Sequence, residues 1–351
     1  MSIPPCGRLA MRARIPAPFL FALLALCAFA GNAIAAPRTL PPLDLLHAQD
    51  NWLVAGRLAE IVPGRLVFER TEVLAGKGEV PERIDVRAPV LPQPPAVGSD
   101  YIFAYTMVHR DKRLPGKKAG NVEGATLLSS TGLEPALFAD TPALREILHA
   151  GHSVAGRQSR AMLDLLLAAL AGEDAALRDL AAAQIAMEPR IARHLRRADR
   201  ALLEQAVRDG KLAPDTRSTL LLAAATRPGD LGGWWKDVAT DVVTSTPTGG
   251  YSRETPVPVG IVLTAFEVLE QHAVKLAPES ISRWLRSPER LLVERAGSML
   301  RRESPALERT ATEQALADPA LPETTRRYLG DHLRRLDRAA GGKDARKDGA
   351  T

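Results

Sequence analysis

The sequence predicts an α+β protein in which a small antiparallel β-barrel is followed by a long helical array. Apolar residues alternate with a period of about two over residues 50–132, whereas from Thr141 onward they recur three or four residues apart. An apolar N-terminal stretch precedes both patterns. We therefore divide the chain into a signal peptide (1–35), a barrel (40–132), a helical domain (141–338) and a charged, disordered tail (339–351).

The first 36 residues have the features of a secretory signal peptide. Three arginines precede an unbroken run of apolar or small residues over 19–30, and Ala33-Ile34-Ala35 forms a small-x-small cleavage signal. We expect cleavage after Ala35. Since no Arg-Arg pair precedes the apolar run, we expect the general secretion route and a periplasmic location in a bacterium. A lipid anchor at Cys27 and an uncleaved anchor are the alternatives.

Export changes what the composition implies. Both cysteines, Cys6 and Cys27, lie within the expected signal peptide, so the processed chain has no disulfide and no thiol chemistry. The full chain has 46 basic and 41 acidic residues, and removal of the three signal-peptide arginines leaves 43 against 41. This near balance favours neither nucleic acid nor an anionic membrane as partner. No integral membrane span is expected after cleavage, because the apolar run is short.

Residues 50–132 predict five short strands with turn signals between them and no helical crossover, which favours a small barrel. The order of motifs resembles OB-fold-like barrels of the kind found in secreted netrin- and TIMP-like modules. It consists of Gly56 within a strand, Leu66-Val67-Phe68, Val73-Leu74-Ala75-Gly76, and Val97-Gly98 followed by Tyr101-Ile102-Phe103. The resemblance implies a fold, and it assigns no functional residue.

Helical signals recur from Thr141 to the region of Leu336. Thr141-Pro142, Ser287-Pro288 and Ser304-Pro305 each place a capping hydroxyl before a proline suited to the first helical position. About eleven helices of ordinary length, with short links between them, account for this region.

A faint internal repeat runs through the helical region. Residues 174–178, 214–217 and 322–326 each open a helix with a cap or an acid, followed by an arginine and then an apolar and alanine-rich stripe. This pattern over 141–338 resembles HEAT-type repeats, in which stacked helix pairs bury apolar faces that a single pair leaves exposed. A compact, non-repetitive helical bundle is the rival interpretation.

No motif in the chain predicts catalysis, a cofactor or a metal. Residues 151–156 nearly match the nucleophile elbow of serine hydrolases, but helical residues precede them, so we place Ser153 in an interhelix loop. His149 and His152 are spaced as a metal-ligand pair could be, yet no third ligand accompanies them. Structural or surface histidines are the simpler interpretation.

The chain has two candidate binding sites, and the first is a tryptophan pair together with the long loop that follows it. Trp234 and Trp235 are adjacent, so both rings cannot easily enter one core, and we expect one to be exposed for binding. The loop at 244–258, which contains Tyr251 and Arg253, has no periodicity and is long for helical packing. The competing interpretation is a loose insertion between two helix pairs.

The second candidate is a basic loop at 109–121, between the fourth and fifth expected strands. In OB-type barrels this position often flanks the ligand face, and a basic tip there suits phosphate or carboxylate groups. A solvated hairpin tip is the alternative. The basic residues of the loop are Arg110, Lys112, Arg113, Lys117 and Lys118.

These patterns together predict an exported, non-enzymatic protein that binds a protein partner in the cell envelope through a helical-repeat surface. A wall-directed hydrolase is the second hypothesis, and a small-ligand carrier that uses the barrel is the third. Two facing acids in a cleft would favour the enzyme, whereas a stacked helical surface would favour the binding protein.

Overall fold

The computed structural model describes residues 40–89, 91, 94–108, 124–249, 251 and 258–347, with side chains up to Arg338. The expected signal peptide and the basic loop at 109–121 lie outside the described residues. The first part of the described chain contains α2 (Pro42–Leu46), β1 (Asn51–Val62), β2 (Arg65–Ala75), β3 (Arg83–Arg87), β4 (Asp100–Val108), β5 (Gly124–Leu127) and β6 (Leu137–Ala139).

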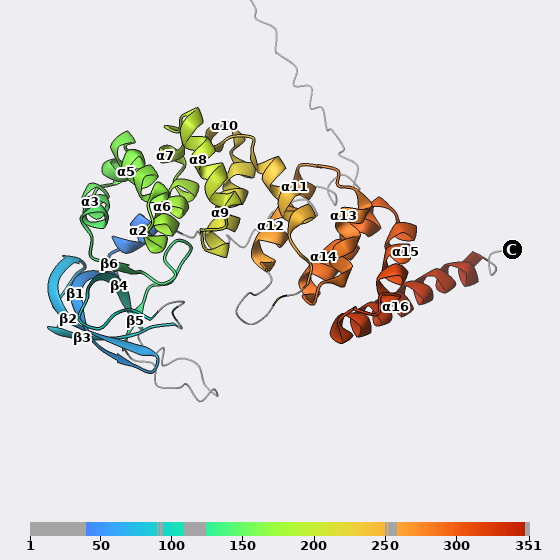
Figure 1. The fold of residues 1–351 in the computed structure, drawn as a ribbon, viewed down its shortest axis with the longest axis horizontal. Helices are drawn as coiled ribbons and strands as arrows, with labels where there is room; N and C mark the ends of the chain where they lie inside the picture. The colour runs from blue at the N-terminus through green and yellow to red at the C-terminus, as the bar shows by residue number, and fades with distance from the viewer. Residues whose placement is uncertain are drawn as a thin grey trace, which may run out of the picture. The chain divides into compact units, whose positions relative to one another are not determined.

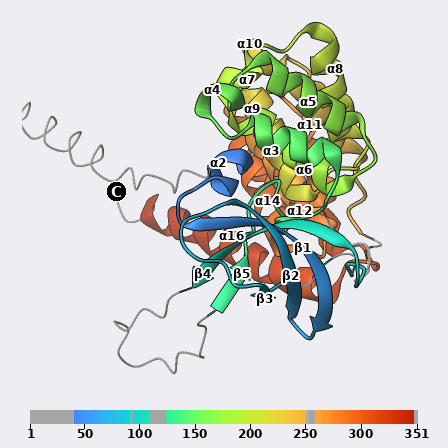
Figure 2. The same cartoon turned by 90° about the vertical axis from the view of Figure 1, so that its left-hand side faces the viewer.

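Strands β1–β5 form a closed barrel. They pair in the order β1-β2-β3-β5-β4, β4 pairs back with β1, and β6 adds to β4 (Figures 1 and 2). The pairing of β3 with β5 is parallel, so the barrel is mixed and our expectation of an antiparallel barrel was wrong in this respect. The reason is topological: β4 intervenes between β3 and β5, so no hairpin joins them. This order is compatible with an OB-like barrel.

Aromatic and branched side chains fill the barrel interior. The rings of Phe68 on β2 and Phe103 on β4 stack with their centroids 4.1 Å apart. Gly56 permits the close approach of β1 and β2, because a Cβ at this position would lie 2.8 Å from the carbonyl oxygen of Glu69. The glycine that the sequence analysis placed within a strand is therefore required by packing.

The remainder of the chain is helical. Its elements are α3 (Pro142–Ala150), α4 (Val154–Arg157), α5 (Arg160–Ala171), α6 (Ala175–Met187), α7 (Pro189–Ala192), α8 (Arg197–Arg208), α9 (Pro214–Thr226), α10 (Pro228–Leu231), α11 (Trp235–Ser245), α12 (Val259–Gln271), α13 (Pro278–Ser282), the 3₁₀ helix η1 (Arg283–Arg286), α14 (Arg290–Glu303), α15 (Pro305–Leu316) and α16 (Glu323–Lys347). Because α16 continues through Lys347, the tail expected to be disordered is helical over 339–347.

Eight of the described helices pack in two rows. Helices α6, α9, α12 and α14 contact one another in sequence, and α5, α8, α11 and α13 form a second row beside them (Figure 1). Each helix therefore packs mainly on its neighbours, as in a stacked array. Helix α6 also contacts α2 and β6, and its residues 180–186 are all buried. One apolar core consequently runs from the outer side of β1 and β4 into the first helices.

The faint sequence repeat has a structural cause. Arg178, Arg217 and Arg326 are each the fourth residue of a helix, and each donates to carbonyl groups at the end of the preceding long helix. The acceptors are Gly172 and Glu173, Val207, and Leu316 and Asp318, at 2.7–3.2 Å. Since the last carbonyl groups of a helix lack partners within it, these arginines satisfy them and tie successive helices together.

The predicted caps are only partly correct. Thr141 caps α3 through a hydrogen bond that its hydroxyl accepts from the Leu144 amide at 3.3 Å. Ser304 precedes α15 but makes no such bond. Ser287 is fully buried and lies before the cap of α14, where its hydroxyl accepts from the Glu289 amide at 3.1 Å and its carbonyl accepts from Thr325.

Candidate functional site

The tryptophan pair is not exposed, so this part of our expectation was wrong. Trp234 is 8% exposed and Trp235 only 2%. Trp234 lies just before α11, where its indole nitrogen donates to the carbonyl of Leu231 at 2.8 Å, and Trp235 packs against His272 with ring centroids 4.5 Å apart. Both rings belong to the same buried apolar cluster, because Trp234 precedes the helix and its ring can turn inward as well as that of Trp235.

The adjoining loop is only partly described. Tyr251 is half-buried, and its hydroxyl donates to the carbonyl of Pro247. Burial raises the pKa of this phenol, although the positive charge of Arg283 opposes the shift. Arg253 lies outside the described residues, as do Arg110, Lys112, Arg113, Lys117 and Lys118 of the basic loop. A binding role for these residues therefore stays a prediction.

Ser153 is a helix cap in an interhelix loop, as the sequence predicts. Its hydroxyl accepts a hydrogen bond from the amide of Gly156 at 2.9 Å, at the start of α4. This contact uses the hydroxyl for structure. No sheet strand enters the turn from the preceding side, since α3 ends at Ala150.

A pocket of about 280 Å³ lies between the barrel and helix α3, and it is the strongest candidate for a ligand site. Three histidines from separate parts of the fold line it. His47 follows α2, His149 belongs to α3, and His152 lies in the loop after α3. Leu53, Leu74 and Leu148 supply the apolar walls, and Glu72 and Arg145 complete the lining.

Charged groups around this pocket are tied to one another. Arg145 donates to both carboxylate oxygens of Asp140 at 2.7 Å and to Glu72 at 2.8 Å. Arg157 forms an ion pair with Asp44 at 2.8 Å and donates to the carbonyl of Gly151 at 2.7 Å. The pocket thus has a rigid polar rim in which little charge is left uncompensated.

His47 has the most perturbed imidazole of the pocket. Burial, with smaller contributions from the positive charge of Arg157 and from His152, lowers its pKa from 6.5 to about 4. The ring lies edge-on to that of His152, with centroids 5.7 Å apart, and its Nε2 atom is buried without a hydrogen-bond partner among the described residues. At neutral pH the ring is therefore an uncharged hydrogen-bonding group suited to a small polar ligand.

Sequence reasoning found only part of this pocket. It singled out His149 and His152 from their spacing but missed His47, which lies about 100 residues earlier and is brought close by the packing of α2. No local signal marks that proximity. Within the described part of the chain, no group of three or more metal-ligating side chains is arranged to hold a metal ion.

A second group of interest is acidic. The side chain of Glu134, in the loop before β6, keeps solvent access, but partial burial and then the charges of Asp215 and Asp179 raise its pKa to about 7. Burial also raises the pKa of Asp179, although the Ala213 amide donates to that carboxylate at 2.8 Å. Carboxyl groups on α6 and α9 therefore act electrostatically on Glu134 in the loop.

The third feature is basic. Arg193, Arg196 and Arg197, at the junction of α7 and α8, are exposed, and in the structure as described their guanidinium groups form no ion pair or hydrogen bond. Other arginines of the array, such as Arg290 and Arg286, are paired. Arg290 binds Glu294 at 2.7 Å and Arg286 binds Asp318 at 2.9 Å. We call the first three residues the basic corner.

Comparison with known protein families, curated proteins and solved structures finds no match to this chain. Over the residues that the structure describes, no helix combines the length and apolar character needed to cross a membrane. The site assignments therefore rest on the geometry above.

Proposed function

We propose that the protein is exported to the periplasm and binds a partner protein there through the surface of its helical array. The signal-like N-terminus supports export. A HEAT-like solenoid and an OB-like barrel are the finer interpretation of the two parts of the fold. Stacked helix rows present an extended, rigid surface, which is how helical-repeat proteins bind their partners.

The observation that carries this proposal is the basic corner. An exposed arginine whose guanidinium has no carboxylate partner is free to form charge-assisted hydrogen bonds with another protein, and arginine is enriched in protein interfaces. Arg193, Arg196 and Arg197 lie within five residues of one another, whereas Arg286 and Arg290 of the array have carboxylate partners within the chain.

The test is a crosslinking pull-down of the C-terminally tagged protein from its own cells, compared with two triple variants. The first reverses the charges of the basic corner (R193E, R196E, R197E). The second makes the same charge change at three arginines that are already paired: Arg290, Arg327 and Arg334. Recovery of one envelope protein by the native chain and the control, but not by the first variant, supports the proposal. Equal recovery by all three chains places the contact outside the basic corner. Failure to recover any crosslinked partner contradicts the binding function.

The intact mass of the recovered chain tests export separately. A chain that begins at Ala36 supports the signal peptide, whereas an unprocessed mass contradicts it.

A wall-directed hydrolase remains the second candidate, because Glu134 has a pKa of about 7 beside two other carboxyl groups. Such a group is protonated often enough at neutral pH to act as a general acid. Release of soluble fragments from purified cell wall by the native protein, and its loss in Glu134→Gln, would favour this function. Absence of release from the native protein would remove it.

A further inference from the structure

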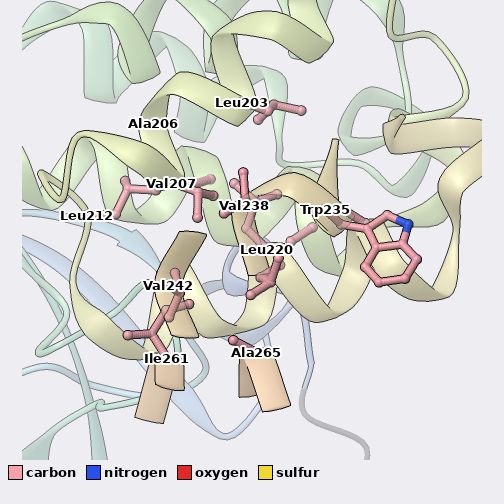
Figure 3. Close-up of a cluster of buried hydrophobic side chains, with 14 of the residues drawn as sticks. Leu203, Ala206, Val207, Leu212, Leu220, Trp235, Val238, Val242, Ile261 and Ala265 are labelled. Carbon is pink, nitrogen blue, oxygen red and sulfur yellow. The ribbon is translucent and has the colours of Figure 1, made fainter. Parts of the chain in front are cut away.

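A second cavity, of about 260 Å³, lies within the helical array itself, where α8 and α11 end beside the beginning of α9. Val207 on α8 and Val238 and Val242 on α11 form its apolar wall and belong to the buried cluster drawn in Figure 3. Ser245 and Thr246, at the C-terminal end of α11, also line it. The lining thus combines apolar side chains with polar and charged ones.

Arg217 also lines the cavity and is only partly paired. Its Nε atom donates to the carbonyl of Val207 at 2.9 Å, whereas its two terminal nitrogens make no hydrogen bond or ion pair within the described part of the chain. Burial lowers the pKa of this guanidinium, and the charge of Asp209 offsets this only in part. Arg217 is half-buried, and a partly desolvated cation with unused donors favours an anionic partner.

The equivalent arginine of another helix shows what is unusual here. Arg326 is also the fourth residue of its helix, and both of its terminal nitrogens donate to backbone carbonyls, at 2.8 and 2.7 Å. Arg217 makes the corresponding contact with the preceding helix through Nε alone. Its terminal fork is therefore left free beside the cavity.

The other charged groups of the cavity already have partners. Arg208 donates to Glu204 at 3.0 Å and also pairs with Asp241. The Asp241 carboxylate thus compensates Arg208. Arg217 is the charged group of this cavity that a ligand can still satisfy.

We propose that this cavity binds a carboxylate that carries a short aliphatic chain. The terminal nitrogens of Arg217 hold the two carboxylate oxygens, since the planar fork of a guanidinium matches that geometry. The three valines contact the chain. The volume is below the roughly 300–1,000 Å³ of sites for drug-sized molecules, so the ligand is small. The inference is independent of the partner protein proposed above.

Such a carboxylate has two sources: a free short-chain acid, or the C-terminus of a peptide with a small apolar last residue. The test is an NMR titration of the full chain with labelled valine methyl groups. The probes are butyrate, acetate, butanol, and an acetylated tripeptide ending in valine with either a free or an amidated C-terminus.

We expect saturable shifts of the Val207, Val238 and Val242 signals with butyrate and none with butanol. Acetate lacks two methylene groups, so it should bind about tenfold more weakly or worse. Tighter binding of the free-carboxylate peptide than of butyrate, with no binding of its amide, identifies a chain terminus as the ligand. The reverse order identifies a free acid.

Variants separate the expected role of Arg217 in ligand binding from its structural role of joining α9 to the end of α8. Arg217→Gln should weaken butyrate binding at least tenfold, and Arg217→Lys, which keeps the charge but loses the fork, should weaken it less. Arg326→Gln removes comparable hydrogen bonds to the end of the preceding helix, away from the cavity, and should leave butyrate binding unchanged. Ser245→Phe fills the cavity without altering Arg217 and should abolish binding in a chain that still folds. Absence of saturable shifts, equal shifts with butanol, or binding that survives both Arg217→Gln and Ser245→Phe would overturn the proposal.

Discussion

Replacement of His47 should change how the stability of the protein depends on pH. The folded state lowers the pKa of His47 from 6.5 to about 4, so between these values the unfolded chain binds a proton that the folded chain does not. The free energy of unfolding therefore decreases as pH falls through this window, and the effect is absent above pH 6.5.

The magnitude follows from the size of the shift. About 2.5 pKa units at 1.36 kcal/mol per unit would give roughly 3 kcal/mol for a fully buried ring. The ring keeps some contact with solvent, which screens the interaction, so we expect about 1–2 kcal/mol. His47→Gln removes the titrating group and retains an amide that can donate to a backbone carbonyl.

Urea unfolding at several pH values between 7 and 4 measures the effect. Other groups also titrate in this range, so the informative quantity is the difference between the native chain and His47→Gln. The native chain should lose about 1–2 kcal/mol more than the variant. His194→Gln, which removes an exposed histidine, is the control and should follow the native curve. Parallel curves for all three proteins would refute the argument that burial keeps His47 neutral.

Three further predictions follow from the packing and the charges. Glu134→Gln should remove a stability loss that accompanies a rise in pH from 4.5 to about 7, because the folded state raises the pKa of Glu134; urea unfolding at pH 5 and pH 8 tests this, and an unchanged difference contradicts it. Arg326→Ala should lower the free energy of unfolding by about 1–2 kcal/mol, because it leaves two backbone carbonyls unsatisfied. Arg327→Ala, on the exposed side of α16, should lower it little. Equal losses in denaturant unfolding would contradict the role of Arg326 in joining the helices. Gly132→Ala should cost about 2–4 kcal/mol, because its φ is +78° and a Cβ would lie 2.4 Å from that of Ala183, while Gly229→Ala meets no atom within 4 Å and is the control in thermal unfolding.

Much of the architecture could be predicted because it depends on local periodicity. The change from a period of two to helical spacing near Thr141 placed the barrel before the helices, and the recurring arginine after a helix start indicated repeated structure. The parallel pairing of β3 and β5 could not be predicted, since the strand pattern reports alternation and not the identity of the neighbouring strand.

The tryptophan pair shows a different limit. Adjacent residues of one helix point to different sides, so one ring was expected to be exposed. Trp234 precedes the helix, however, and the turn around Gly232 lets both rings enter the same apolar core.

The sequence by itself determined the order of the two structural classes, the apolar stripes of the helices and the presence of an arginine at the start of several of them, because these features depend on residues within a few positions of one another. Only the tertiary structure decided which side chains meet. The histidine pocket joins residues about 100 positions apart, and the fork of Arg217 is free beside a cavity while that of Arg326 is used. Such contacts are set by how helices and strands pack, and local sequence carries no record of the distance between packed elements.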